Sequence, residues 1–112
     1  MRNKHPRPLA WLHWEVKTPP FSPAARMEAG ILLRRLQEGE TLGLPHSRPM
    51  PMVGAASHEL RIVDAAQSWR IVYHISDEAI VILEVFSKKS GKTPRRILQT
   101  CQQRLQAFLR SY

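Results

Sequence analysis

The chain has 112 residues, of which 43% are hydrophobic and 23% charged, as is usual for one compact globular domain. Its single cysteine, Cys101, excludes an internal disulfide, and no apolar run approaches the roughly 20 residues of a membrane-spanning helix. Seventeen lysines and arginines against nine acidic residues give a net charge of +8. We therefore expect a cytoplasmic protein that binds a polyanion and no membrane.

The first ten residues are polar and rich in proline, so residues 1–10 are predicted to form a flexible arm. Residues 11–112 are predicted to form a single domain. Within the segment Leu9–Lys17, aromatic and apolar residues predominate, which favours a first strand that reaches back into the end of the arm.

A helix is predicted to begin at Ser22 and Pro23, because serine is a common N-cap and proline is tolerated in the first turn. Alanines and leucines at three- and four-residue spacing continue this helix to about Glu38. The proline-rich connection at residues 41–57 cannot be helical, but it has room for a short edge strand at Met50–Val53.

Three further strands are predicted at residues 58–63, 68–75 and 79–86, and the short turns between them favour an antiparallel meander. A last helix is predicted with Thr93 as its N-cap and Pro94 as its first residue. The sequence therefore predicts an α+β domain with a twisted antiparallel sheet and both helices packed on one face.

Alternation of side chains along the three strands separates two faces of this sheet. One face is almost entirely apolar and is predicted to pack on the helices. The other face is predicted to be open and to carry most of the polar side chains, among them Glu59, Arg61, Arg70, His74, Glu84 and Lys88. Two arginines and a histidine on adjacent strands indicate a basic surface, although an uncovered face is often polar merely because it meets solvent.

Positive charge is concentrated after the last strand. Residues 87–112 contain seven basic residues and no acidic one, whereas residues 1–86 contain ten basic and nine acidic residues. This asymmetry favours a polyanion site over a merely solvated helix. The predicted RNA-binding residues are Phe86, Lys89, Lys92, Arg95 and Arg96. Phe86 could stack on a base or simply cover the sheet.

The same face contains residues that can cleave RNA without a metal. No histidine or cysteine pair has the spacing of metal ligands, so no metal or other cofactor is expected. Arg61 and Arg70 are suited to clamp a phosphate, and a lysine crowded by cations has a lowered pKa. His74 is the better acid or base candidate, since His58 is predicted to point toward the apolar side.

The ordered segments "HELRI", "WRIVY" and "AIVILEVFSKKSGKTPRRI" together resemble the RelE/ParE toxin superfamily, and most closely its HigB-like, phage-derived subgroup. The resemblance covers about residues 12–108. It implies a RelE-like small domain and a toxin of a type II toxin–antitoxin system. Such a toxin is typically a metal-independent, ribosome-dependent mRNA endonuclease that inhibits translation, and its antitoxin is a helix-turn-helix protein of the HigA kind.

By this resemblance, the residues at motif positions are Glu59, Arg61, Arg70, Tyr73, Lys88 and Lys89. Strand alternation assigns Tyr73 to the core, so the predicted catalytic residues are Arg61, Arg70, His74 and Lys88. Two alternatives remain open: a ParE-like inhibitor of DNA gyrase, and a basic nucleic-acid-binding domain without catalytic activity.

Overall fold

The computed structural model describes residues 6–12, 16, 18–65, 67–89 and 91–111. The elements are β1 (Leu9–Trp11), α1 (Pro23–Gln37), β2 (Ser47–Pro49), β3 (Ser57–Val63), β4 (Ser68–Ile75), β5 (Ile80–Lys88) and α2 (Arg95–Ser111). Five strands and two helices make a small α+β domain, consistent with a RelE-like fold, and the predicted fold class is confirmed.

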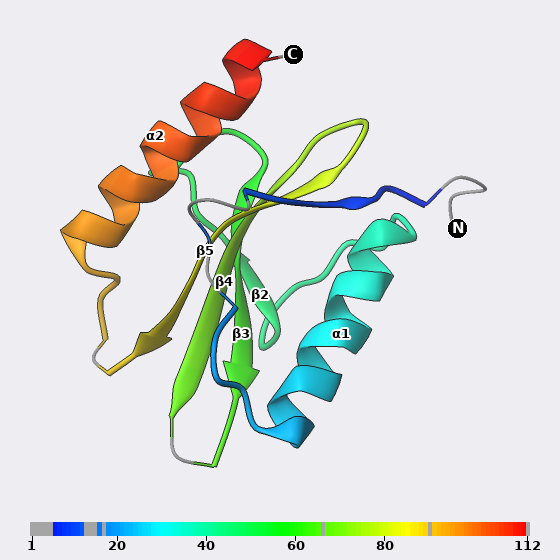
Figure 1. The fold of residues 1–112 in the computed structure, drawn as a ribbon, viewed down its shortest axis with the longest axis vertical. Coiled ribbons are helices and arrows are strands. Elements are labelled where there is room, and N and C mark those ends of the chain that lie inside the picture. The colour runs from blue at the N-terminus through cyan, green and yellow to red at the C-terminus, as the bar shows by residue number, and fades with distance from the viewer. Residues whose placement is uncertain (1–5, 13–15, 17, 66, 90, 112) are drawn as a thin grey trace.

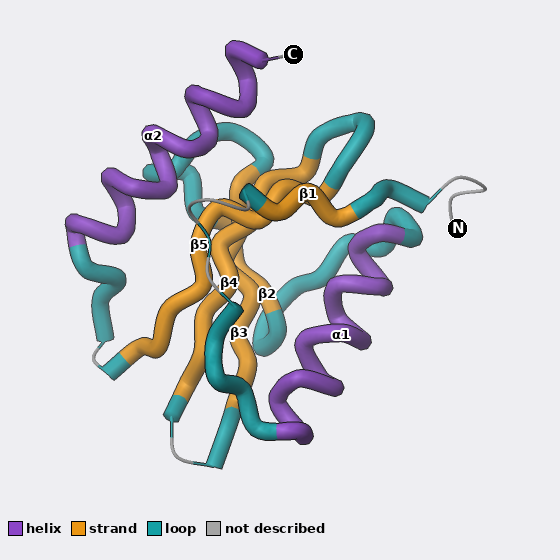
Figure 2. Tube along the Cα trace, in the orientation of Figure 1, coloured by secondary structure: helices purple, strands orange, loops and turns teal. Residues whose placement is uncertain are grey.

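The five strands form one sheet in the order β1-β5-β4-β3-β2 (Figure 2). The meander β3-β4-β5 is antiparallel as predicted, and β2 pairs antiparallel with β3. β1 instead pairs in parallel with β5, with Leu9 opposite Ile80. The predicted antiparallel sheet is confirmed for β2 to β5, but β1 departs from it. A parallel neighbour becomes possible because the long connection through α1 and the meander separates β1 from β5.

The two helices lie on opposite faces of the sheet (Figure 1), and the prediction that both pack on one face was wrong. α1 packs on the face that carries Leu60 and Ile71. α2 packs on the other face, where Val72 and Leu83 join its apolar stripe. The predicted open face is thus partly covered, and only its remainder can form a site.

A β-bulge explains this error. Val72 is opposite Glu84 while Tyr73 is opposite Ile82, which leaves Leu83 as an extra residue in β5. The bulge shifts the alternation, so Val81 and Leu83 lie on the α2 face although they were predicted to share a face with Ile71. Their side chains give α2 an apolar surface to cover.

Local signals place α1 correctly but not the next strand. The Ser22 hydroxyl accepts a hydrogen bond from the Ala25 amide at 3.1 Å, as an N-cap does. The edge strand predicted at Met50–Val53 lies instead at Ser47–Pro49. Met50 starts a turn, because its carbonyl accepts from the Val53 amide at 3.0 Å.

The N-terminal segment contacts the domain where the structure describes it, since the Arg7 amide donates to the Gln37 carbonyl at 2.9 Å. The predicted first strand is present at Leu9–Trp11, while residues 13–15 and 17 of that prediction lie outside the described residues. No helix in the described ranges is both long and apolar enough to cross a membrane.

Candidate functional site

The C-terminal ends of β3 and β5 and the start of β4 meet at one end of the sheet, which is the lower end in Figure 1. Arg61 and Arg70 are direct cross-strand partners there. Lys88 is opposite Ser68, two residues before Arg70 and on the same side of the strand pair. The structure therefore brings together three of the four predicted catalytic residues.

A buried carboxylate lies at the centre of this group. Glu59 has no exposed surface, and its Oε1 atom lies 3.3 Å from the Nε of Arg48 and 3.4 Å from the Nε of Arg70. Its other oxygen, Oε2, accepts a hydrogen bond from the Thr93 hydroxyl at 3.1 Å. We call Arg48, Glu59, Arg61, Arg70 and Lys88 the Glu59 cluster.

The Glu59 cluster contains four cations and one carboxylate, and so carries three uncompensated positive charges. Burial lowers the pKa of Lys88, Glu59 opposes that shift, and Arg70, Arg48 and Arg61 add to it. Burial likewise lowers the pKa of Arg70, with Glu59 again opposing. A lysine with a lowered pKa releases its proton more readily, which suits proton transfer.

The members of the cluster differ in their access to solvent. Arg70 is 7% exposed, whereas the Arg48 side chain is 40% exposed and Arg61 and Lys88 are half-buried. Beside the cluster, Arg61 and Arg70 line a hollow of about 310 Å³. An anion in this hollow would meet both arginines, while the buried Glu59 carboxylate pairs with Arg70.

The predicted RNA-binding residues surround this end of the sheet. Lys89, Lys92, Arg95 and Arg96 are exposed in the connection from β5 to α2 and in the first turn of α2. Phe86 is opposite Arg70 and half-buried against the core under α2, so its ring covers part of the sheet. The exposed cations can contact a phosphate backbone without further rearrangement.

Thr93 does not cap α2 as predicted. The described helix begins at Arg95, and the Ile97 amide donates to the Pro94 carbonyl at 3.0 Å. The Thr93 hydroxyl donates to Glu59 instead, which ties the basic connection to the sheet.

His74 lies on the same face as the cluster but is separate from it. It follows Arg70 by four residues along β4, about 13 Å at the usual rise per residue. Its ring is buried and packs edge-on to Phe108 of α2 at 6.3 Å between centroids. Its Nδ1 atom lies 2.9 Å from the Ala55 carbonyl oxygen. β4 therefore places His74 away from the arginines, and the last turns of α2 cover it.

This burial predicts an acid-sensitive fold. Burial lowers the pKa of His74 below the ordinary value of 6.5, and burial with repulsion from His74 lowers the pKa of His58. Below about pH 6.5 the unfolded chain thus binds protons more readily than the folded chain. We expect the free energy of unfolding to fall between pH 7 and 5, by up to about 1.4 kcal/mol per pH unit for each histidine.

Urea unfolding at pH 7.5, 6.5 and 5.5 measures this slope. His74→Asn should reduce the slope, because the amide can still donate to Ala55 but does not titrate in this range. Equal slopes for the two proteins would show that His74 contributes nothing to the acid sensitivity.

Two members of the site were not identified from the sequence. Arg48 was missed because the edge strand was predicted three residues too late, which removed Arg48 from the sheet. Glu59 was noted as a motif residue but given no role. Alternation placed it beside Arg61 on the polar face, and a carboxylate next to cations there was the available signal.

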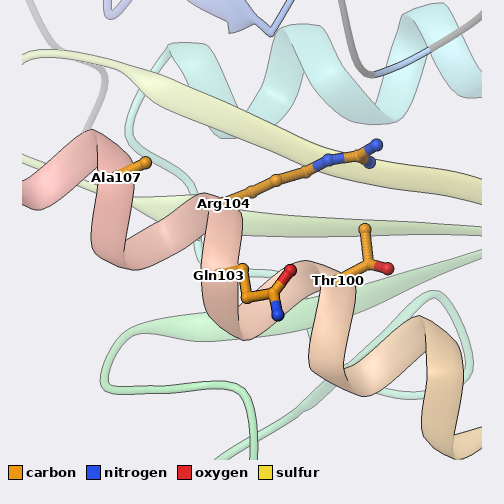
Figure 3. A pocket seen from close by; sticks show the side chains of 4 residues that line it. All are labelled: Thr100, Gln103, Arg104 and Ala107. Atoms are coloured by element: carbon orange, nitrogen blue, oxygen red, sulfur yellow. The ribbon is translucent and has the colours of Figure 1, made fainter.

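A second hollow, of about 220 Å³, lies on α2 (Figure 3) and is lined by none of the residues of the Glu59 cluster. Thr100, Gln103, Arg104 and Ala107 line it from successive turns. Arg104 donates to the Leu83 carbonyl at 2.7 Å and pairs with Glu84 at 3.2 Å. These contacts bridge α2 and the bulge in β5, so Arg104 has a structural role.

Comparison with protein families gives a match over most of the chain. The model of the family described as phage-derived protein Gp49-like (DUF891) matches residues 20–106, which include every member of the Glu59 cluster. No curated protein matches the chain significantly.

Proposed function

Because the chain belongs to the Gp49-like family of phage-derived proteins, a family associated with toxin–antitoxin toxins, we propose that it is the toxin of a type II toxin–antitoxin system. Its activity would be metal-independent, ribosome-dependent cleavage of mRNA. The observation that carries this proposal is the Glu59 cluster, which presents arginines and a lysine of lowered pKa at one end of the sheet.

The chemistry needs three contributions from the protein. The RNA 2′-hydroxyl must lose a proton, the negative charge on the pentacoordinate phosphorus must be stabilised, and the 5′-oxygen must gain a proton. Arg61 and Arg70 would stabilise the charge, which is usually the largest part of such catalysis. Lys88 would take part in proton transfer. Glu59 has no exposed surface, so it is suited to orient Arg70 and not to touch the substrate.

We assign His74 to the fold and not to proton transfer, because it is buried under Phe108 and engaged with Ala55. The exposed cations Lys89, Lys92, Arg95 and Arg96 would grip ribosomal RNA or the mRNA backbone. In this proposal, a helix-turn-helix antitoxin of the HigA kind is the partner that neutralises the toxin.

Controlled expression in bacteria tests the proposal, with translation rate measured and mRNA ends mapped by primer extension. We expect growth arrest and new mRNA ends within translated frames. Growth arrest with intact mRNA would overturn the proposed endonuclease activity. It would favour the alternative of a ParE-like inhibitor of DNA gyrase. Normal growth would contradict a toxin and favour the alternative of a basic nucleic-acid-binding domain without toxic activity.

A further inference from the structure

The hollow beside the Glu59 cluster has walls of three kinds. Arg61 and Arg70 of the cluster form one side. Pro45 and Val63 provide apolar surface, and Val63 is 72% exposed. Polar groups come from His46, just before β2, from Ser68 at the start of β4, and from Glu28 of α1. Helix α1 runs along this side of the sheet (Figure 1).

We propose that this hollow is a subsite for one nucleobase of an RNA substrate, next to the phosphate that the cluster arginines hold, and that Glu28 selects the base. The inference rests on the proposed function, because it takes the bound phosphate from that site. It adds a specificity residue on α1, an element to which the cleavage chemistry assigns no role.

The size and walls of the hollow favour a single base. A volume of about 310 Å³ is at the small end of ligand pockets, too small for a folded partner but adequate for one ring system. The faces of a base are apolar, and its edge carries the donors and acceptors. Pro45 and Val63 offer apolar surface for a face, while Glu28 and His46 offer polar groups for the edge.

The chemistry of Glu28 specifies which bases fit. An ionised carboxylate only accepts hydrogen bonds, so it favours a base with an exocyclic amino group and disfavours the carbonyl oxygen at the same position of uracil. The Glu28 side chain is half-buried, and no hydrogen bond or ion pair joins it to another of the described residues. It is therefore available to a ligand in the hollow.

Charge places the nucleotide in one orientation. Arg61 and Arg70 belong to the cluster with three uncompensated positive charges, whereas Glu28 adds a negative charge elsewhere on the wall. A phosphate is attracted to the arginines and repelled by Glu28, and an amino group has the opposite preference. A single nucleotide can satisfy both, with its phosphate at the arginines and its base edge at Glu28.

Titration of the full-length protein with cytidine 5′-monophosphate, uridine 5′-monophosphate and ribose 5-phosphate, followed by NMR, tests this subsite. The two nucleotides differ at the amino or oxo group that Glu28 would read, and ribose 5-phosphate lacks the base. We expect the cytidine nucleotide to bind on the order of tenfold more tightly than the uridine nucleotide, and ribose 5-phosphate to bind most weakly.

Glu28→Gln should bring the ratio of the two nucleotide affinities close to one, because an amide both donates and accepts. Glu78→Gln, at an exposed glutamate in the turn before β5, is the matched control and should leave the ratio unchanged. Equal binding of all three ligands, binding of none, or a ratio that survives Glu28→Gln would each overturn the subsite.

The outcomes separate this inference from the proposed function. A protein that cleaves mRNA but does not distinguish the two nucleotides is a nuclease without this base subsite. A protein that distinguishes them through Glu28 but leaves mRNA whole keeps the subsite and loses the proposed activity.

Discussion

If the protein is the proposed mRNA endonuclease, Arg70→Ala is expected to lower its cleavage rate by about 10²–10³-fold, the usual effect of removing one group that stabilises transition-state charge. Arg70 combines an ion pair to buried Glu59 with a place on the wall of the hollow. Its Nε lies 3.4 Å from Glu59 Oε1, and its Nη1 donates a hydrogen bond to the Trp69 carbonyl at 3.1 Å. Because Arg70 is nearly buried and has these two contacts, it needs little reorganisation when charge develops on the phosphate.

Single-turnover cleavage on ribosomes that carry a defined mRNA is the measurement. Arg70→Lys keeps the charge but loses the planar fork, so it should recover only part of the rate. Arg26→Ala removes an exposed arginine from α1 and should cleave normally. Thermal unfolding of each variant separates lost chemistry from lost structure. Full cleavage by a folded Arg70→Ala protein would exclude Arg70 from the site.

Most of the fold could be predicted because its signals are local. Ser22 and Pro23 define the start of α1, and the turns on either side of β4 define three strands within a few residues. The errors come from features without a local signal. The bulge at Leu83 changes the phase of β5, and the parallel pairing of β1 depends on packing of residues far apart in the sequence.

The site was predictable to the extent that alternation along strands decides it. Alternation placed Arg61, Arg70 and Lys88 on one face, and they do meet there. It placed His74 on that face too, but it cannot tell which part of a face a helix covers. α2 covers the His74 end and leaves the arginine end open. The burial of His74 therefore depends on how α2 packs on the sheet, and alternation along a strand does not reveal that packing.

Glu59→Ala is expected to lower the free energy of unfolding by about 3–5 kcal/mol, because removing one partner of a buried ion pair leaves the other charge uncompensated. Arg70 would be left nearly buried beside Arg48, Arg61 and Lys88 with no nearby carboxylate of the cluster. The Thr93 hydroxyl would also lose its acceptor. Since small domains are stable by only about 5–15 kcal/mol, urea unfolding should detect this loss easily.

Removing the charges of Glu59 and of both its arginine partners together should not lower the free energy of unfolding. A variant with Glu59→Leu, Arg48→Met and Arg70→Met replaces the ion pairs by apolar contacts of similar volume, an exchange that is often neutral or stabilising. Glu78→Ala, at an exposed glutamate, should change stability by less than about 0.5 kcal/mol. If Glu59→Ala alone stayed within 1 kcal/mol of the parent protein, Glu59 would not be the residue that holds the cations in place. If the triple variant were as stable as the parent protein, the fold would not need the buried carboxylate or its ion pairs.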